Sequence, residues 1–364
     1  ALGAPVRTTT LTYARSTLVP ASVLARIDTV AADGTARPPW ELDYTGGFET
    51  PRVLEIAHAP AIDPTADGHA WLDLDGDALP DLLDATGDVW RYRKGRGDVL
   101  APTWSTFPAP AAALTKTARF ADLTGDGVED LLAQPGEGEL WAFTGGAMPF
   151  GTAIPLTVEF GFDLSAPAVA LVDLDLDRRV DVLRHDDTDG WIWLRHPDAP
   201  GYQPAEPVLP PPAGMRLGDP GVQLADLDGD RLPDLVRILP SEARIIVAAG
   251  EGLGRFAEPL DLKGVPAMQE SSRWELADLN GDGAADLVRL GNRSLDLYTN
   301  QHDDSVVLAA SVPWPALVAD EVVILSDIDA SGTVDVLRID PTGTAPWRAW
   351  SFAERPGLLA RVRT

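Results

Sequence analysis

"DLDGDALPD", residues 73–81, places four aspartates within nine residues. Carboxylates this close together repel one another, so a compact loop of this sequence needs something that neutralises them. Related stretches recur at intervals of about 50 residues: "DLTGDGVED" from Asp122, "DLDLDRRVD" from Asp173, "DLDGDRLPD" from Asp226, "DLNGDGAAD" from Asp278 and "DIDASGTVD" from Asp327. Six copies in register indicate a repeat architecture.

Each copy lies between two short apolar runs, such as "HAWL" and "LLDA" around the first copy and "VVILS" and "VLRI" around the sixth. A third apolar or aromatic segment follows, and then a Gly- and Pro-rich stretch with room for a fourth strand. Four strands per unit fit the blade of a β-propeller. We therefore expect an all-β fold with six blades. A seventh blade from the N-terminal region and a linear β-solenoid are the alternatives. The closed ring is favoured because the coils of a solenoid are usually shorter than these repeats, and because a ring also removes exposed sheet edges.

The spacing of the acidic residues predicts a metal site in each loop. Side chains at loop positions 1, 3, 5 and 9 can converge on one point, where the backbone carbonyl of position 7 adds an oxygen ligand. An all-oxygen set suits Ca²⁺, whereas Zn²⁺ prefers His or Cys, and Mg²⁺ demands stricter octahedral geometry. The loop is not an EF-hand, because glycine falls mostly at position 4 and the last acid at position 9. The candidate ligands are Asp73, Asp75, Asp77, Leu79 and Asp81; Asp122, Thr124, Asp126, Val128 and Asp130; Asp173, Asp175, Asp177, Arg179 and Asp181; Asp226, Asp228, Asp230, Leu232 and Asp234; Asp278, Asn280, Asp282, Ala284 and Asp286; and Asp327, Asp329, Ser331 and Asp335.

The sequence predicts up to six Ca²⁺ ions, with doubt at the third and sixth loops. Leu176 stands in the third loop where glycine is expected, and Arg178 and Arg179 add positive charge beside it. In the sixth loop Ala330 replaces the glycine and Ser331 replaces an aspartate. If position 4 requires a positive φ, both loops carry an unfavourable residue there.

Composition excludes several classes of function. The net charge is −27, with 56 acidic residues against 29 basic ones, so the chain would repel nucleic acid and offers no basic patch to an anionic membrane. It has no cysteine and no apolar run long enough to insert into a bilayer. The five histidines have no metal-binding or triad spacing, and the carboxylates recur six times, unlike a single active site. We therefore expect a non-enzymatic protein.

The motif DxDGDxxxD between apolar strands resembles the FG-GAP or VCBS repeat of integrin α-subunit propellers. The resemblance covers about residues 68–355. It implies a β-propeller with calcium in the loop between the first two strands of each blade, held by the loop positions named above.

The two ends of the chain resemble a more specific group of proteins. "TLTYARSTLVPASVLARIDTVAADGTARPPWELDYTGGF" (residues 10–48) and "RPGLLARVRT" (residues 355–364) resemble the segments that flank this region in the B components of bacterial Tc toxins and in virulence-plasmid B proteins. This implies an N-terminal β-segment (1–50), a calcium-binding propeller (51–355) and a C-terminal junction strand (356–364). It also implies a secreted bacterial toxin complex. In that family a hollow shell encloses a toxic polypeptide, and the propeller docks on a translocation partner and acts as a gate. A free-standing adhesin or lectin-like binding module is the alternative.

Overall fold

The computed structural model describes residues 6–15, 22–44, 48, 50–110, 118–136, 139–146, 150–158, 161–186, 189–196, 199–268, 272–318, 320–352 and 359–363. Within them the protein is all-β, with seven four-stranded antiparallel sheets and one 3-10 helix, η1 (Pro240–Glu242). None of the described residues form a helix with the length and apolar character that a membrane crossing requires. The predicted all-β propeller is confirmed.

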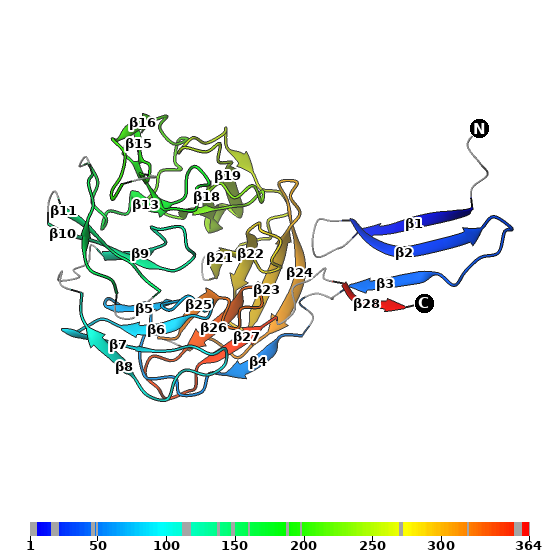
Figure 1. Cartoon of the computed structure of the whole chain (residues 1–364), viewed down its shortest axis with the longest axis horizontal. Helices are drawn as coiled ribbons and strands as arrows, with labels where there is room; N and C mark the ends of the chain where they lie inside the picture. The colour runs from blue at the N-terminus through cyan, green and yellow to red at the C-terminus, as the bar shows by residue number, and fades with distance from the viewer. Residues whose placement is uncertain are drawn as a thin grey trace.

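Six of the sheets are arranged around a common centre and form the blades of the propeller (Figure 1). Blade 1 contains β5 (His69–Leu72), β6 (Asp81–Asp84), β7 (Val89–Arg93) and β8 (Ser105–Pro108). Blade 2 contains β9 (Ala118–Ala121), β10 (Asp130–Gly136), β11 (Glu139–Phe143) and β12 (Ile154–Pro155). Blade 3 contains β13 (Val169–Val172), β14 (Asp181–His185), β15 (Gly190–Trp193) and β16 (Glu206–Val208).

The other three blades repeat the same order of strands. Blade 4 contains β17 (Val222–Ala225), β18 (Asp234–Leu239), β19 (Arg244–Ala248) and β20 (Leu260–Asp261). Blade 5 contains β21 (Arg273–Ala277), β22 (Asp286–Leu290), β23 (Ser294–Asn300) and β24 (Val306–Pro313). Blade 6 contains β25 (Val322–Ser326), β26 (Asp335–Ile339), β27 (Arg348–Ser351) and β4 (Arg52–Glu55).

Blade 6 closes the ring by joining the two ends of the propeller sequence. Its three inner strands come from the C-terminal part of the chain, and its outer strand β4 comes from the N-terminal part. β4 pairs with β27 in the register Arg52↔Ser351 to Glu55↔Arg348. The Ile56 amide then donates to the carbonyl oxygen of Trp347 at 2.9 Å. The ring therefore has six blades, and the N-terminal region supplies a strand to the sixth blade instead of a seventh blade.

The apolar core is divided among the blade interfaces. Each of the six pairs of neighbouring blades encloses one cluster of buried side chains, for example Leu227, Val236, Trp274 and Leu287 between blades 4 and 5. The first three residues of every second strand are buried, because Val and Leu side chains on both faces of the strand contact neighbouring blades. Most of the described tryptophans lie in these clusters or pack against them.

The seventh sheet is formed by both ends of the chain and lies to one side of the ring (Figure 1). Its order is β1–β2–β3–β28, with β1 (Arg7–Arg15), β2 (Ser22–Ala31), β3 (Trp40–Tyr44) and β28 (Leu359–Arg363). It occupies the predicted N-terminal β-segment and the predicted junction strand. Residues 1–5, 16–21, 45–47, 49, 356–358 and 364 of those segments lie outside the described residues. Phe48 packs edge-to-face on Phe352, with ring centroids 5.5 Å apart, and so belongs to the propeller core.

Candidate metal-binding loops

The six acidic motifs form the six loops between the first and second strands of the blades. We call them loops 1 to 6, which are residues 73–81, 122–130, 173–181, 226–234, 278–286 and 327–335. In every blade the aspartate at position 9 begins the second strand and pairs with the residue just before position 1, as in Leu72↔Asp81 and Ala225↔Asp234. The strand register thus brings the two ends of each loop side by side, and it does so in the same way in all six blades.

The backbone follows the same path in all six loops. Positions 4 and 6 both have positive φ in each of them: Gly76 and Ala78, Gly125 and Gly127, Leu176 and Arg178, Gly229 and Arg231, Gly281 and Gly283, and Ala330 and Gly332. Leu176 (φ 65°) and Ala330 (φ 55°) therefore adopt the conformation for which glycine was expected. The residues that raised doubt about loops 3 and 6 do not alter the backbone of those loops.

The aspartate at position 1 organises its own loop. Asp73 Oδ1 accepts the amide of Gly76 at 2.8 Å, and Asp73 Oδ2 accepts the amide of Ala78 at 2.7 Å. The equivalent bonds from positions 4 and 6 recur in loops 2 to 5, and in loop 6 the position 6 amide, that of Gly332, donates to Asp327. Such bonds hold the chain in a tight turn around the carboxylate.

In loops 1 to 5 the aspartate at position 9 links the loop to a residue just beyond the part of the third strand that pairs with the second. In loop 1 Asp81 Oδ2 accepts the Leu74 amide at 3.2 Å and Asp81 Oδ1 accepts the Gly95 amide at 2.7 Å. The same pair of bonds recurs at Asp130, Asp181, Asp234 and Asp286. In loop 6 Asp335 Oδ2 accepts the Ile328 amide at 3.2 Å, whereas its buried Oδ1 receives no backbone amide from the described residues.

Burial makes ionisation of the position 9 carboxylates costly. It raises the pKa of Asp81, Asp181 and Asp335 to about 7 and that of Asp234 to about 6. Burial also raises the pKa of Asp286 well above its ordinary value, and that of Asp130 in the same direction. The other aspartates of each loop add to the increase by repulsion. A cation beside these groups would favour their ionised form.

Four loops bring three carboxylates close enough to share one cation. The triads are Asp73, Asp75 and Asp81; Asp173, Asp175 and Asp181; Asp226, Asp228 and Asp230; and Asp327, Asp329 and Asp335, and within each the oxygens lie within 4.8 Å of one another. Loops 2 and 5 carry Thr124 and Asn280 at position 3, so they supply a neutral oxygen there. The side chains at position 7 instead pack between blades: Val128 lies over Gly76 and Arg179 lies over Gly125.

The donor chemistry of the loops fits a hard divalent cation. Every predicted side-chain ligand offers oxygen, apart from Arg179 and the apolar residues at position 7, for which a backbone carbonyl is the predicted ligand. Asp75 Oδ1 is buried and has no hydrogen-bond partner among the described residues, so it is an acceptor available to a cation. A bound Ca²⁺ would add positive charge among the clustered carboxylates.

Some loops already contain a positive or donor group. The Lys94 ammonium contacts Asp75 Oδ2 and lies 2.9 Å from Asp77 Oδ2. In loop 3 the Arg179 guanidinium pairs with Asp177 Oδ2 at 2.9 Å, and in loop 5 His302 Nε2 lies 3.3 Å from Asp282 Oδ2. Lys94 was not among the predicted site residues. It lies 19 residues beyond Asp75 and reaches that residue only through the pairing of β7 with β6.

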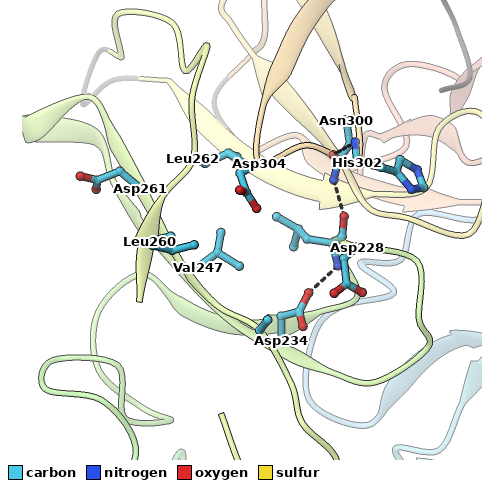
Figure 2. A pocket seen from close by; sticks show the side chains of 11 residues that line it. Asp228, Asp234, Val247, Leu260, Asp261, Leu262, Asn300, His302 and Asp304 are labelled. Atoms are coloured by element: carbon cyan, nitrogen blue, oxygen red, sulfur yellow. Dashed lines mark hydrogen bonds between the residues drawn. The ribbon is translucent and has the colours of Figure 1, made fainter. Parts of the chain in front are cut away.

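A cavity of about 80 Å³ lies beside loop 4, between blades 4 and 5. Figure 2 shows Asp228 and Asp234 on one side of it, with Val247, Leu260 and Asp304 around it. Asn300 Nδ2 donates to the Leu227 carbonyl at 2.6 Å, and the Leu227 amide donates to Asp234 Oδ2 at 2.7 Å (Figure 2). The cavity is therefore lined by loop 4, which includes Leu227, and by Asn300, and the hydrogen bonds of these two residues hold Asp234 in place.

No family model and no curated protein matches the sequence. The fold is similar to solved structures of known proteins. One is the Tc holotoxin pore of Photorhabdus luminescens, with a TM-score of 0.79, 21% identity and 98% of this chain covered. A second is the TcdB2–TccC3–Cdc42 structure, with a TM-score of 0.61, 20% identity and the same coverage. This chain spans 17% and 18% of those two chains. A third is an Agrocybe aegerita lectin that recognises non-reducing terminal N-acetylglucosamine, with a TM-score of 0.54, 18% identity and 92% of each chain covered.

Proposed function

We propose that this chain is a non-enzymatic, calcium-stabilised β-propeller that mediates protein–protein contact in a secreted Tc-type toxin complex, as the docking and gating module of its shell. The observation that carries the proposal is the similarity to the Tc holotoxin pore over 98% of the chain. That share includes the seventh sheet together with the ring.

The surface of the seventh sheet supports a role within a larger assembly. Leu11, Tyr13 and Trp40 are each about half exposed there, at 48%, 58% and 52%. Exposed aromatic and aliphatic side chains gathered on one small sheet are typical of protein contact surfaces. The strongly acidic composition, by contrast, does not suit a nucleic-acid partner.

The carboxylates of the loops support the calcium part of the proposal. All six loops share one backbone path and an oxygen-rich ligand set at the same place in each blade. Repetition of one carboxylate cluster in every blade favours a structural ion over a single catalytic centre. Bound Ca²⁺ would join the first and second strands of each blade at the loop.

The docking role is tested by the mass of the native gene product in the producing cell, detected with an antibody against this propeller. A product several-fold larger than 38.8 kDa supports a module of a shell protein. A product near 38.8 kDa contradicts it. For the larger product, binding to the purified translocation component from the same strain is then measured, with a variant carrying Leu11→Ser, Tyr13→Ser and Trp40→Ser as the comparison.

A lectin-like binding module is the second candidate. It is favoured by the Agrocybe aegerita lectin, because the similarity covers 92% of that chain and so describes a free-standing propeller. Among the described tryptophans, however, only Trp40 is as much as half exposed, and it lies on the seventh sheet away from the loops. Binding to a glycan array, abolished by free sugar, would support the lectin in place of the toxin module.

A further inference from the structure

Loops 1 and 4 form a matched pair within one chain. Their sequences, "DLDGDALPD" and "DLDGDRLPD", differ only at position 6, where Ala78 (φ 65°) and Arg231 (φ 73°) adopt the same left-handed conformation. Both loops end in a buried aspartate that accepts two backbone amides. The two loops therefore offer the same residue types as ligands, although the three carboxylates that lie within 4.8 Å of one another are at positions 1, 3 and 9 in loop 1 and at positions 1, 3 and 5 in loop 4.

The residue that follows the third strand differs between the two blades. Lys94 precedes Gly95, whose amide donates to Asp81, and Ala249 precedes Gly250, whose amide donates to Asp234. Lys94 and Ala249 are thus equivalent positions. The other blades carry neutral residues there: Thr144, Leu194, Thr299 and Ser351. Ser351 Oγ lies 3.5 Å from Asp329 Oδ2, so in blade 6 the same position also faces a loop carboxylate.

Lys94 places a positive charge where a metal ion would bind loop 1. Its ammonium contacts Asp75 Oδ2 and lies 2.9 Å from Asp77 Oδ2, and these hydrogen bonds raise the pKa of Lys94 above its ordinary value. The lysine side chain is about one-third exposed, at 32%, so the contact is partly shielded from water. A divalent cation that binds Asp75 and Asp77 must displace this ammonium or share the carboxylates with it.

Loop 4 differs from loop 1 in this respect. Among the ion pairs of the described residues, none joins a basic side chain to Asp226, Asp228, Asp230 or Asp234. Burial, and then the charges of Asp230 and Asp226, raise the pKa of Asp228. Ala249 lines the cavity that reaches Asp228 and Asp234. The carboxylates of loop 4 therefore repel one another with no paired cationic side chain among the described residues to offset the repulsion.

We propose that Lys94 is a tethered counter-ion that competes with divalent cations for loop 1, so that loop 4 fills with Ca²⁺ at a lower concentration than loop 1. The inference rests on the proposed binding of Ca²⁺ by the loops. An ion pair of this exposure contributes up to about 1 kcal/mol, which corresponds to roughly a fivefold change in affinity. Repulsion between Lys94 and a bound cation acts in the same direction.

The experiment removes the charge at Lys94, introduces one at Ala249, and combines the two substitutions. Each protein is stripped of metal with a chelator and titrated with CaCl₂ in a calorimeter. Lys94→Met keeps the aliphatic side chain and removes the charge, whereas Ala249→Lys introduces the charge beside loop 4. Asp75→Asn and Asp228→Asn identify the heat that belongs to each loop, and Lys263→Met controls for the change in net charge. We expect Lys94→Met to raise the Ca²⁺ affinity of loop 1 about fivefold, and Ala249→Lys to lower the Ca²⁺ affinity of loop 4 by a similar factor. In the variant that carries both substitutions, loop 1 should bind Ca²⁺ more tightly than loop 4.

Thermal melting gives a second readout that does not depend on assigning heats. In chelator, Lys94→Met should melt below the wild type, because loop 1 loses its counter-ion, and in saturating Ca²⁺ that difference should disappear. If the wild type binds Ca²⁺ but Lys94→Met leaves both the affinity of loop 1 and the melt in chelator unchanged, the role of Lys94 is overturned. If the wild type binds no Ca²⁺ at all, the proposed calcium function itself is overturned.

Discussion

Loop 1 and loop 4 have the same acidic residues, the same strand register and the same left-handed turn, yet their carboxylates meet different surroundings. In loop 1 the Lys94 ammonium contacts two of the aspartates. In loop 4 a small alanine and a cavity occupy the equivalent place. The comparison shows that the motif alone does not determine how a loop is neutralised, because the third strand of the blade supplies the facing residue.

Two of the remaining loops also have a basic side chain beside their carboxylates. Arg179 pairs with Asp177 in loop 3, and His302 lies beside Asp282 in loop 5. Both residues come from positions that vary between blades, whereas the aspartates at positions 1 and 9 are common to all six loops. A repeated ligand set can therefore give sites of graded affinity around one ring. If the loops bind Ca²⁺ as proposed, this arrangement predicts that they fill over a range of Ca²⁺ concentrations.

The largest effect is expected at position 9, where loops 1 and 4 should behave alike. Asp81→Ala and Asp234→Ala each leave two backbone amides without an acceptor: the buried amides of Leu74 and Gly95, or the buried amide of Leu227 and the partly buried amide of Gly250. Because each unsatisfied amide costs about 1–3 kcal/mol, we expect a loss of roughly 2–4 kcal/mol in the free energy of unfolding. Denaturant unfolding in chelator measures it.

The exposed Asp88 provides the control for position 9, because Asp88→Ala should change stability by less than about 0.5 kcal/mol. Similar losses for Asp81→Ala and Asp234→Ala would confirm that the two loops share one framework. A loss confined to one of the two loops would contradict it.

The melting temperature should also depend on pH, with a smaller effect than that of the substitutions at position 9. The dependence should come from both loops. The pKa of Asp81 is raised to about 7 and that of Asp234 to about 6, whereas the pKa of aspartate in an unfolded chain is about 3.9. A carboxyl whose pKa is raised by folding stabilises the protein below the unfolded pKa, and this contribution is lost as pH rises through the folded pKa. The melting temperature in chelator should therefore fall by several degrees between pH 5 and pH 8.

Ca²⁺ should oppose this trend, because it binds the ionised carboxylates. The increase in melting temperature on adding Ca²⁺ should be larger at pH 8 than at pH 5.5. Asp75→Asn and Asp228→Asn should each remove more of the calcium effect at pH 8 than at pH 5.5, because burial raises the pKa of the position 9 carboxylate in both loops. A pH dependence in only one of the two variants would contradict this.

The sequence was sufficient to predict the blades but not the way in which the ring closes. The recurrence of the aspartate motif predicted the six loops, and each one lies between the first and second strands of a blade. The outer strand of blade 6 is only "RVLE", residues 52–55, far from the rest of that blade in sequence. A four-residue strand carries too little periodicity to reveal its partner, so the possibility of seven blades stayed open.

The candidate sites, like the ring, were predicted only in part from the sequence. Periodicity placed the aspartates, and the structure brings three of them together in each of four loops. It could not reveal Lys94, because the contact with Asp75 depends on the register of β6 and β7 and not on spacing along the chain. Doubt about Leu176 came from treating glycine as a requirement, whereas the strand register and the bonds to Asp173 impose the left-handed turn on leucine. Calcium in these loops remains a prediction.

The smallest effect is expected from relieving backbone strain at position 6. Ala78 and Arg231 both have positive φ, which costs a residue with a Cβ about 1–2 kcal/mol. Glycine removes that cost but loses more conformational entropy on folding, so Ala78→Gly and Arg231→Gly should each stabilise the protein by about 0.5–1 kcal/mol in chelator. Gly76→Ala is the opposite control, because it adds strain at φ 78° and places a Cβ 2.9 Å from Val128 Cγ2. Equal gains at Ala78 and Arg231 would locate the difference between the loops at Lys94, whereas unequal gains would locate part of it at position 6.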